Sequence, residues 1–270
     1  MEKLPQISVI TVSFNVEEFI EQTIQSILSQ SYLQREYIII DGGSTDGTVG
    51  IIGRYESRLA YWHSRPDRGI AHAFNLGLAQ ARGDWILYLN ADDLLLEPTG
   101  LEQMAPHLVR HQDADVVFAQ MISLFREQDP KPVPLCKIGG HPWRWQEFRR
   151  RNMIPHQAAF THRHFFNRVG CFDETFRMAM DYEHFLRARG GLRAQFVPIP
   201  LVGMRAGGRC VKNIADTLRE FKRAQIKNQA LPRLIAELNF FLRLGRLYSG
   251  RLAHLILDPF ALKINWSGRN

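Results

Sequence analysis

Cysteine is scarce in this chain, with three residues among 270. They lie far apart, at Cys136, Cys171 and Cys210, and no C-x-x-C pair occurs. This set excludes a disulfide-stapled scaffold and a cysteine-based zinc site, because both need paired cysteines at defined spacings. A sparse, odd number of cysteines also fits a reducing compartment.

Long hydrophobic runs and nucleotide-binding glycine motifs are also absent. No stretch approaches the ~18 uncharged apolar residues that a membrane-spanning helix needs. The first apolar run, Ile7–Val12, is too short for the core of a secretory signal and is typical of a strand. No G-x-x-x-x-G-K-[ST] segment exists, and the glycines of residues 42–47 do not fit G-x-G-x-x-G. We therefore expect a cytoplasmic protein that is not a P-loop NTPase.

Acidic residues are few at the C-terminal end. Residues 205–270 contain thirteen Lys and Arg but four Asp and Glu, a net charge of +9, so residues 1–204 have a net charge of −2. Beside the arginines 243, 246 and 251, apolar residues recur at helical spacing at positions 234, 238, 241, 245, 248, 252 and 255. This pattern is typical of a helix on an anionic membrane surface. A helix packed on the rest of the protein fits equally well, and a nucleic-acid-binding tail is a further alternative.

The hydrophobic content of 45% is ordinary for a globular protein, and its pattern alternates between strand and helix. Helical stripes of apolar residues are expected in 17–30 and 69–82. The expected buried strands are short apolar runs bounded by Gly, Pro, Asp or Asn: Ile7–Val12, Tyr37–Ile40, Leu59–His63, Trp85–Leu89 and Val116–Ile122. Repeated strand–helix units predict an α/β fold with a mainly parallel sheet flanked by helices, followed by a C-terminal helical tail.

The second half has weaker patterns. Residues 129–145 are rich in Pro and Gly and are expected to form a loop between subdomains. Helices are expected near 163–169 and 181–189. The segment Phe196–Val202 is interrupted by two prolines, which favours an edge strand.

Acids and small polar residues follow each of the first four expected strands. These segments are Thr11–Asn15, Asp41–Thr48, Ser64–Gly69 and Asn90–Asp93. In such a sheet the ligand lies beyond the carboxyl ends of the strands. Four strands would thus bring Asp41, Asp67 and the Asp92–Asp93 pair to one edge. Adjacent like charges are costly unless a cation offsets them, so the simplest physical account is a divalent metal that holds phosphates.

The order and spacing of these four segments resemble glycosyltransferase family 2, which has the GT-A fold. The resemblance covers roughly residues 5–205. It implies that Val12, Ser13 and Phe14 line the nucleotide base and that Asp41 accepts a hydrogen bond from a uracil-type ring N–H. It also implies that Asp92, the last residue of the family's D-x-D segment, ligates Mn²⁺ or Mg²⁺ bridging the donor diphosphate.

Two positions depart from the family pattern. Asn90 replaces the usual first aspartate; its amide can bond ribose or sugar hydroxyls but adds no charge. Asp93 then becomes a candidate second metal ligand. The Arg-Asn pair of many members is here Phe74-Asn75, so Arg65 or Arg68 are candidates for the arginine contact. Asn75 is expected to be merely solvated.

Several other polar residues have structural interpretations. Asp46 is expected to cap the helix that begins near Thr48, and Asp173 to serve a turn or cap. An acceptor contact and a structural role are both open for His156. The segment Gly207–Arg209 fits either a mobile flap over the diphosphate or a linker.

The resemblance places a catalytic base in a D-Y-x segment at the start of a helix, where Asp181, Glu183 and His184 compete. The resemblance selects Asp181. Residues 181 and 183 point about 200° apart on a helix, so only one of the two acids can face the acceptor. We expect Asp181 to have a free side chain at the mouth of that helix.

The resemblance implies an inverting glycosyltransferase that uses a nucleoside-diphosphate sugar, with UDP favoured, and a saccharide or lipid-linked acceptor for cell-surface polysaccharide or glycolipid synthesis. The expected organisation is a catalytic domain of residues 1–205, divided into a donor half (1–125) and an acceptor half (126–205), and a tail of residues 206–270. A cytoplasmic enzyme bound peripherally to the membrane by that tail would fit. A metal-dependent nucleotidyltransferase is the rival enzyme. A nucleic-acid-binding protein is a third alternative, but it leaves the acidic strand ends unexplained.

Overall fold

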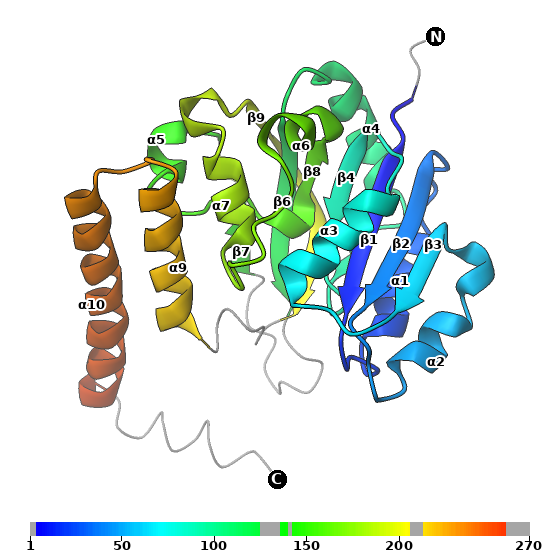
Figure 1. Cartoon of the computed structure of the whole chain (residues 1–270), viewed down its shortest axis with the longest axis horizontal. Coiled ribbons are helices and arrows are strands. Elements are labelled where there is room, and N and C mark those ends of the chain that lie inside the picture. The colour runs from blue at the N-terminus through cyan, green and yellow to red at the C-terminus, as the bar shows by residue number, and fades with distance from the viewer. Residues whose placement is uncertain (1–3, 125–135, 140–141, 206–212, 258–270) are drawn as a thin grey trace.

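The computed structural model describes residues 4–124, 136–139, 142–205 and 213–257, with the backbone alone for 123–124, 136–139 and 246–257. Within this part of the chain, nine strands form one sheet in the order β3-β2-β1-β4-β8-β6-β9-β5, with β7 beside β6 (Figure 1). The strands are β1 Ile7–Ser13, β2 Arg35–Asp41, β3 Tyr61–Ser64, β4 Trp85–Tyr88, β5 Leu94–Leu95, β6 Val116–Leu124, β7 Cys136–Gly139, β8 Ala159–His162 and β9 Ala194–Arg205. The α-helices are α1 Ile20–Leu28, α2 Thr48–Gly53, α3 Ile70–Gln80, α4 Gly100–Arg110, α5 Trp145–Phe148, α6 Arg163–Val169, α7 Met180–Leu186, α9 Ile214–Lys227 and α10 Arg233–Leu257. Short 3₁₀ turns lie at η1 Glu56–Arg58, η2 His156–Ala158 and η3 Arg189–Gly191.

The predicted α/β sheet flanked by helices is confirmed, but the sheet is mixed. Strands β3, β2, β1 and β4 are all parallel, as expected from repeated strand–helix units. Beyond β4 the direction changes, because β8 runs antiparallel to both β4 and β6. The parallel half positions the acidic strand ends at one edge. The antiparallel half brings the second half of the chain against it.

Two hydrophobic cores lie on the two faces of the sheet. Alternate residues of a strand point to opposite faces, and Ile38 and Ile40 pack into one core while Ile39 packs into the other. Helices α3, α6 and α7 cover the first core, and α1 and α4 cover the second (Figure 1). Burial on both faces explains why these strands are continuous apolar runs in the sequence.

Two expectations for the second half were wrong. Strand β9 is not an edge strand, because it lies between β6 and β5. Its prolines are tolerated because the β6–β9 pairing shifts register between Phe118 and Gln120, opposite Phe196 and Pro200. The segment expected to be a loop contains β7, which pairs with β6.

The C-terminal helices are confirmed and pack on the rest of the protein. Helix α9 lies against α7, and α10 lies against α9 on the outer side (Figure 1). Among the described helices, none has both the length and the apolar content to cross a membrane. The predicted boundary at residues 205/206 stays a prediction. The segment Gly207–Arg209 and the end of the tail lie outside the described residues.

Candidate active site

The carboxyl ends of β1, β2 and β3 form one row of polar residues. Ser13 pairs with Asp41 across the sheet, and Asp41 pairs with Ser64. The hydroxyls of both serines donate to the Asp41 carboxylate, at 2.8 Å from Ser13 and 2.6 Å from Ser64. The sheet register therefore assembles this part of the site without help from the loops.

Asp41 is fully buried and accepts five hydrogen bonds. Besides the two serines, its donors are the Gly43 N–H at 3.1 Å and the N–H and hydroxyl of Ser44 at 2.8 and 2.6 Å. Burial alone would raise the pKa of this carboxyl, but the donors outweigh it and the pKa lies below its usual value. The predicted bond from a base ring N–H stays a prediction, and it requires one of these hydroxyls to turn away.

Phe14 and Asp67 lie on the two sides of Gly42. A Cβ at Gly42 would lie 2.7 Å from Asp67 Oδ2 and 3.5 Å from the Phe14 ring, so a side chain there would close the gap between them. Asp67 itself is half-buried and accepts a 2.6 Å hydrogen bond from the Gly69 N–H. The Phe14 ring is 58% exposed, although it follows a buried strand. An exposed aromatic ring beside a carboxylate is a suitable surface for a nucleobase.

The loops after β1 and β2 are held together by side-chain hydrogen bonds. Asn15 adopts a left-handed backbone conformation, with φ +49°, and its Oδ1 accepts from the Thr45 N–H at 2.8 Å. Asp46 accepts from the N–H of Thr48, the first residue of α2, at 3.0 Å and from the Glu17 N–H at 3.2 Å. The N-cap residue of α2 is Gly47, so the expected N-cap at Asp46 was wrong by one residue, although Asp46 still bonds the first N–H of the helix.

The acid pair after β4 consists of two residues in different environments. Asp93 is 1% exposed and points inward, where it accepts from the Arg205 N–H at 3.3 Å and from Asn90 Nδ2 at 3.1 Å. Burial and the adjacent Asp92 raise the pKa of Asp93 to about 8, against hydrogen bonds from Arg205, Asn90 and Gln157. Asp92 is half-buried, and among the described residues no other residue donates a hydrogen bond to its carboxylate. Of the two acids, Asp92 is the one with oxygens available to a cation.

The turn η2 connects the acid pair to α7. Gln157 donates a side-chain hydrogen bond to Asp93. The adjacent His156 has its Nδ1 3.7 Å from Asp181 Oδ2. Burial lowers the pKa of His156, although the Asp181 charge opposes the shift, and its Nε2 has no partner among the described residues. Two consecutive residues of η2 therefore connect the two acids: Gln157 contacts Asp93, and His156 lies beside Asp181.

Asp181 is less free than predicted. Asp181 is 8% exposed, and its carboxylate accepts a 2.9 Å hydrogen bond from Asn152 Nδ2. Asn152 is held in turn, because its Oδ1 accepts from the Ile154 N–H. The expectation of a free side chain was wrong because the loop before η2 folds over the start of α7. The carboxylate still has acceptor positions that these contacts do not fill.

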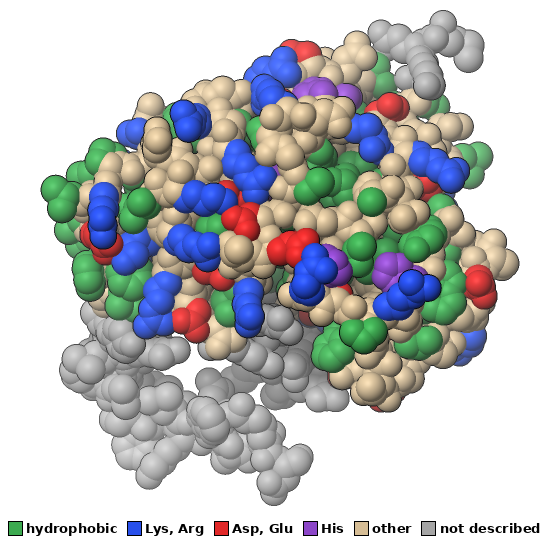
Figure 2. Space-filling view, viewed as in Figure 1, with side chains coloured by type: hydrophobic (Ala, Val, Ile, Leu, Met, Phe, Trp, Pro, Cys, Tyr) green, Lys and Arg blue, Asp and Glu red, His purple; other side chains and the backbone are tan. Residues whose placement is uncertain are grey.

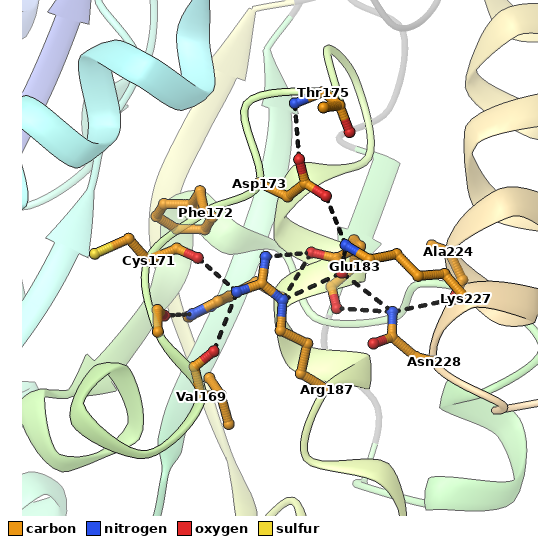
Figure 3. A network of polar contacts seen from close by, with 12 residues as sticks. Val169, Cys171, Phe172, Asp173, Thr175, Glu183, Arg187, Ala224, Lys227 and Asn228 are labelled. Carbon is orange, nitrogen blue, oxygen red and sulfur yellow. Dashed lines mark hydrogen bonds and ion pairs between the residues drawn. The ribbon is translucent and has the colours of Figure 1, made fainter.

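The two competitors of Asp181 are engaged in structural contacts. Glu183 is fully buried and bonds Arg187, Lys227 and Asn228 (Figure 3). His184 is also buried and bonds the Gly170 carbonyl at 2.8 Å, and burial lowers its pKa to about 3. Neither side chain is available to a substrate.

Three other residues singled out from the sequence join elements together. Asn75 is not merely solvated: it exchanges two hydrogen bonds with the backbone of Phe172, at 2.9 and 3.0 Å. Asp173 serves its turn by accepting from the Thr175 N–H at 2.8 Å. Arg68 forms an ion pair with Glu174 at 2.7 Å. Together these contacts join α3 and its preceding loop to the segment before α7.

The sequence patterns missed Arg205, Gln157 and Asn152. Arg205 ends β9 beside the acid pair and lies over the Phe19 ring at 4.8 Å. Burial raises the pKa of Asp92, and the charge of Arg205 opposes that rise without cancelling it. An arginine is expected where a strand ends beside a cluster of acids. The sequence does not show that β9 ends beside Asp92 and Asp93, so Arg205 could not be recognised. Asn152 and Gln157 bond Asp181 and Asp93, which are distant in the sequence, and no local residue spacing predicts these contacts.

The fit of a divalent metal depends on Asp92. Among the described residues, no three His, Cys, Asp or Glu side chains lie together as a metal site. A hard cation such as Mg²⁺ is commonly held by one or two carboxylates, with substrate phosphates and water completing the shell. The half-buried carboxylate of Asp92 fits that donor set, whereas the oxygens of Asp93 are bonded inward.

Comparison with known proteins identifies the family of this chain. A family model described as glycosyl transferase family 2 matches residues 8–176. An uncharacterized glycosyltransferase of Mycobacterium tuberculosis is 33% identical over 193 residues, which are 70% of each chain. A PGL/p-HBAD biosynthesis glycosyltransferase of Mycobacterium bovis is 30% identical over 186 residues, which are 68% of this chain and 69% of that one.

Two solved structures share the fold at low sequence identity. TarS (residues 1–349) of S. aureus in complex with UDP-GlcNAc has a TM-score of 0.65 and 19% identity, and covers 94% of this chain and 76% of its own. The mannosyltransferase PcManGT of Pyrobaculum calidifontis, in complex with GDP-Man and Mn²⁺, has a TM-score of 0.63 and 19% identity, with 99% and 89% covered. Both comparisons include most of the C-terminal helices.

Proposed function

Because the chain belongs to glycosyltransferase family 2, we propose that it transfers a sugar from a nucleoside-diphosphate donor to an acceptor hydroxyl with inversion at the anomeric carbon. UDP is the favoured nucleotide. The observation on which this rests is that η2 connects the Asp92–Asp93 pair to Asp181 of α7: Gln157 bonds Asp93, and the adjacent His156 lies beside Asp181. Asp92 has oxygens available to a cation, and Asp181 has oxygens available to a proton.

The donor lies, in this proposal, across the ends of β1, β2 and β4. The base stacks on the exposed ring of Phe14, with Val12 and Ser13 behind it and Asp41 fixing the surrounding loops. Asp67 and Asn90 bond the ribose or the sugar. Support comes from the positions of Phe14 and Asp67 beside Gly42 and from the UDP-GlcNAc and GDP-Man complexes of proteins with this fold.

Asp92 would be the residue that holds Mn²⁺ or Mg²⁺ for the donor's diphosphate. When bound, such an ion neutralises the charge of the leaving nucleoside diphosphate. We assign the metal-ligand role to Asp92 alone. Asp93, the second predicted ligand, is assigned a structural role because its oxygens accept hydrogen bonds from Asn90 and Arg205. Arg205 adds a positive charge beside Asp92.

Asp181 acts as the general base. It takes the proton of the acceptor hydroxyl as the oxygen attacks the anomeric carbon from the side opposite the diphosphate, and the bond to the diphosphate breaks. Asn152 and His156 hold the carboxylate in position. A single displacement gives inversion, and no covalent glycosyl-enzyme is formed.

Product analysis tests this function. Purified protein with Mn²⁺ is given UDP-GlcNAc, UDP-glucose or UDP-galactose and a panel of alkyl glycosides with free hydroxyls. Release of UDP and a product of inverted anomeric configuration, seen by NMR, is the expected result, with Asp181→Asn slower by ~10²–10⁴ in kcat. Release of pyrophosphate from UTP and a sugar 1-phosphate, with no transfer from the UDP-sugars, would instead identify a nucleotidyltransferase. Retained configuration would exclude the single displacement.

The acceptor is proposed to be a glycolipid or a lipid-linked saccharide at the cytoplasmic membrane surface. The relative from M. bovis is named for PGL/p-HBAD biosynthesis. Helix α10 presents Leu234, Leu238 and Phe241 on one face, at 83%, 55% and 61% exposure. Its other face packs on α9, where Ala236 is buried and Arg243 lies over the Phe221 ring. Figure 2 shows hydrophobic side chains at the left edge of the molecule, over α10.

Vesicle flotation tests the membrane contact. The double variant Leu238→Glu/Phe241→Glu should lose binding to phosphatidylglycerol vesicles, whereas Leu33→Glu, at a site 82% exposed in the turn before β2, should bind as the wild type does. Each basic group near the lipid adds about 1 kcal/mol, so 0.5 M salt should also weaken binding. Equal recovery of both variants with vesicles would remove α10 as the docking surface.

A further inference from the structure

Helix α7 begins without a cap of its own. Its N-cap residue is Ala179, which has no side chain to accept a hydrogen bond. The first N–H groups of a helix have no partner within the helix and need an external acceptor. The N–H groups that lead into α7, up to that of the N-cap residue Ala179, have such an acceptor on another helix.

Glu220 of α9 supplies it. Its carboxylate accepts from three consecutive backbone N–H groups: Arg177 at 2.9 and 3.1 Å, Met178 at 2.8 Å and Ala179 at 2.9 Å. A carboxylate at a helix N-terminus is favoured by the helix dipole as well as by these bonds. Asp181 follows two residues after the last of the three.

Helix α9 also bonds the two residues that follow Asp181, Tyr182 and Glu183. Gln225 donates to the Tyr182 hydroxyl at 3.1 Å. Lys227 bonds both Glu183 and Asp173, as Figure 3 shows, at 2.8 and 2.5 Å. The backbone on both sides of Asp181 is therefore fixed by α9, which follows the predicted catalytic domain in the sequence.

We propose that Glu220 is a positioning residue for the transfer reaction: by holding residues 177–179, it sets the place of the Asp181 carboxylate relative to the donor. The inference rests on the proposed function, in which Asp181 is the base. In the described part of the chain, the hydrogen bonds of the Glu220 carboxylate all come from residues 177–179 and none from a residue assigned to the donor. Its loss should therefore lower kcat, because a small misplacement of a base lowers the rate of proton transfer, while donor binding is unchanged.

The test compares Glu220→Ala with Glu220→Gln and a matched control, Glu237→Ala. Glu237 is an acid of α10 that pairs with Lys222 of α9 at 2.8 Å and does not touch α7. With UDP-GlcNAc, Mn²⁺ and the best acceptor of the alkyl glycoside panel, Glu220→Ala should lower kcat ~10–100-fold with a UDP Kd within about twofold of wild type. Glu220→Gln keeps one acceptor oxygen and should fall between the two, and Glu237→Ala should behave as wild type.

Hydrogen exchange gives a readout that needs no substrate. Amides 177–181 should exchange faster in Glu220→Ala, while a peptide from β1 should keep its protection. A variant with lower Tm but normal kcat would overturn the inference, because it would show that Glu220 only stabilises the fold.

The Asp181→Asn background separates the two proposals. Adding Glu220→Ala to Asp181→Asn should cost little further activity, because both changes act on one group. Full additivity would overturn the Glu220 inference alone. Near-normal turnover of Asp181→Asn itself would overturn the base assignment in the proposed function, and the Glu220 inference with it.

Discussion

Replacing Arg187 by Met should destabilise the protein more than the loss of an ordinary ion pair. Arg187 is the C-cap residue of α7, one turn after Glu183, and donates to the Glu183 carboxylate at 2.6, 3.0 and 3.1 Å. It also bonds the carbonyls of Val169 and Cys171 (Figure 3). The Glu183 side chain is 0% exposed and that of Arg187 is 19% exposed, so water cannot replace the lost partner.

The expected cost is about 3 kcal/mol. Removing one partner of a buried ion pair costs ~3–5 kcal/mol, and the lower end applies because Lys227 and Asn228 still bond Glu183. The matched control is Arg54→Met. The Arg54–Glu21 pair has a similar distance, 3.1 Å, but its side chains are 59% and 38% exposed, so its loss should cost under ~1 kcal/mol.

The stability difference between wild type and Arg187→Met should depend on pH, because Glu183 is ionisable. Burial would raise the pKa of Glu183, but its donors, Arg187 first, hold the pKa below its usual value. A depressed pKa contributes stability above the unfolded pKa of about 4.3 and loses it as pH falls through the folded pKa. The gap between wild type and Arg187→Met should therefore be largest at pH 7, be smaller at pH 4 and shrink further as the pH falls.

Urea unfolding at pH 7 and pH 4 measures this gap. Glu183→Gln/Arg187→Met should regain part of the loss at pH 7, because the buried charge is gone. An Arg187→Met variant as stable as Arg54→Met at pH 7 would refute the reasoning, and so would a gap that widens at pH 4.

Three further predictions follow from single contacts. Gly77→Ala should lose ~1–3 kcal/mol in urea unfolding, because its Cβ would lie 2.5 Å from Ile10 Cγ2, whereas Gly50→Ala, whose Cβ meets nothing within 4 Å, should not destabilise. Phe14→Ala should weaken UDP binding by about 1–3 kcal/mol in calorimetry with little change in Tm, since the ring is exposed; unchanged affinity would remove Phe14 from the base site. Asp41→Asn should lower both Tm and UDP affinity, because an amide NH₂ would face groups that now donate to the carboxylate; a stable variant with normal affinity would contradict this.

The first half of the fold was predictable because its strands are buried on both faces. Runs such as Tyr37–Ile40 have few interpretations other than a central strand, and the acids that follow them come to one edge once the strands are parallel. Helix α3 showed its apolar stripe, and its bounds, Ile70–Gln80, fall within the predicted range. In these segments, local pattern and tertiary structure agree.

The second half was less predictable because its structure depends on distant partners. The prolines of β9 favoured an edge strand, but the irregular pairing with β6 that accommodates them is not visible in the sequence of β9 alone. Likewise, nothing near Asp181 in the sequence indicates Asn152, which lies 29 residues away, or Glu220 of α9. Asp93 was a candidate second metal ligand because Asn90 replaces the family's first aspartate, and its burial against β9, which distinguishes it from Asp92, is not visible in the sequence.

The central claim is that Asp92 ligates the metal ion that binds the donor's diphosphate. Titration of UDP into the protein with and without Mn²⁺ tests this claim most directly. In wild-type protein, Mn²⁺ should tighten UDP binding at least about tenfold, or 1.4 kcal/mol. In Asp92→Asn, UDP should bind with the same affinity whether or not Mn²⁺ is present, and the Tm should stay near that of wild type. An equal gain from Mn²⁺ in both proteins, or no gain in the wild type, would contradict the account.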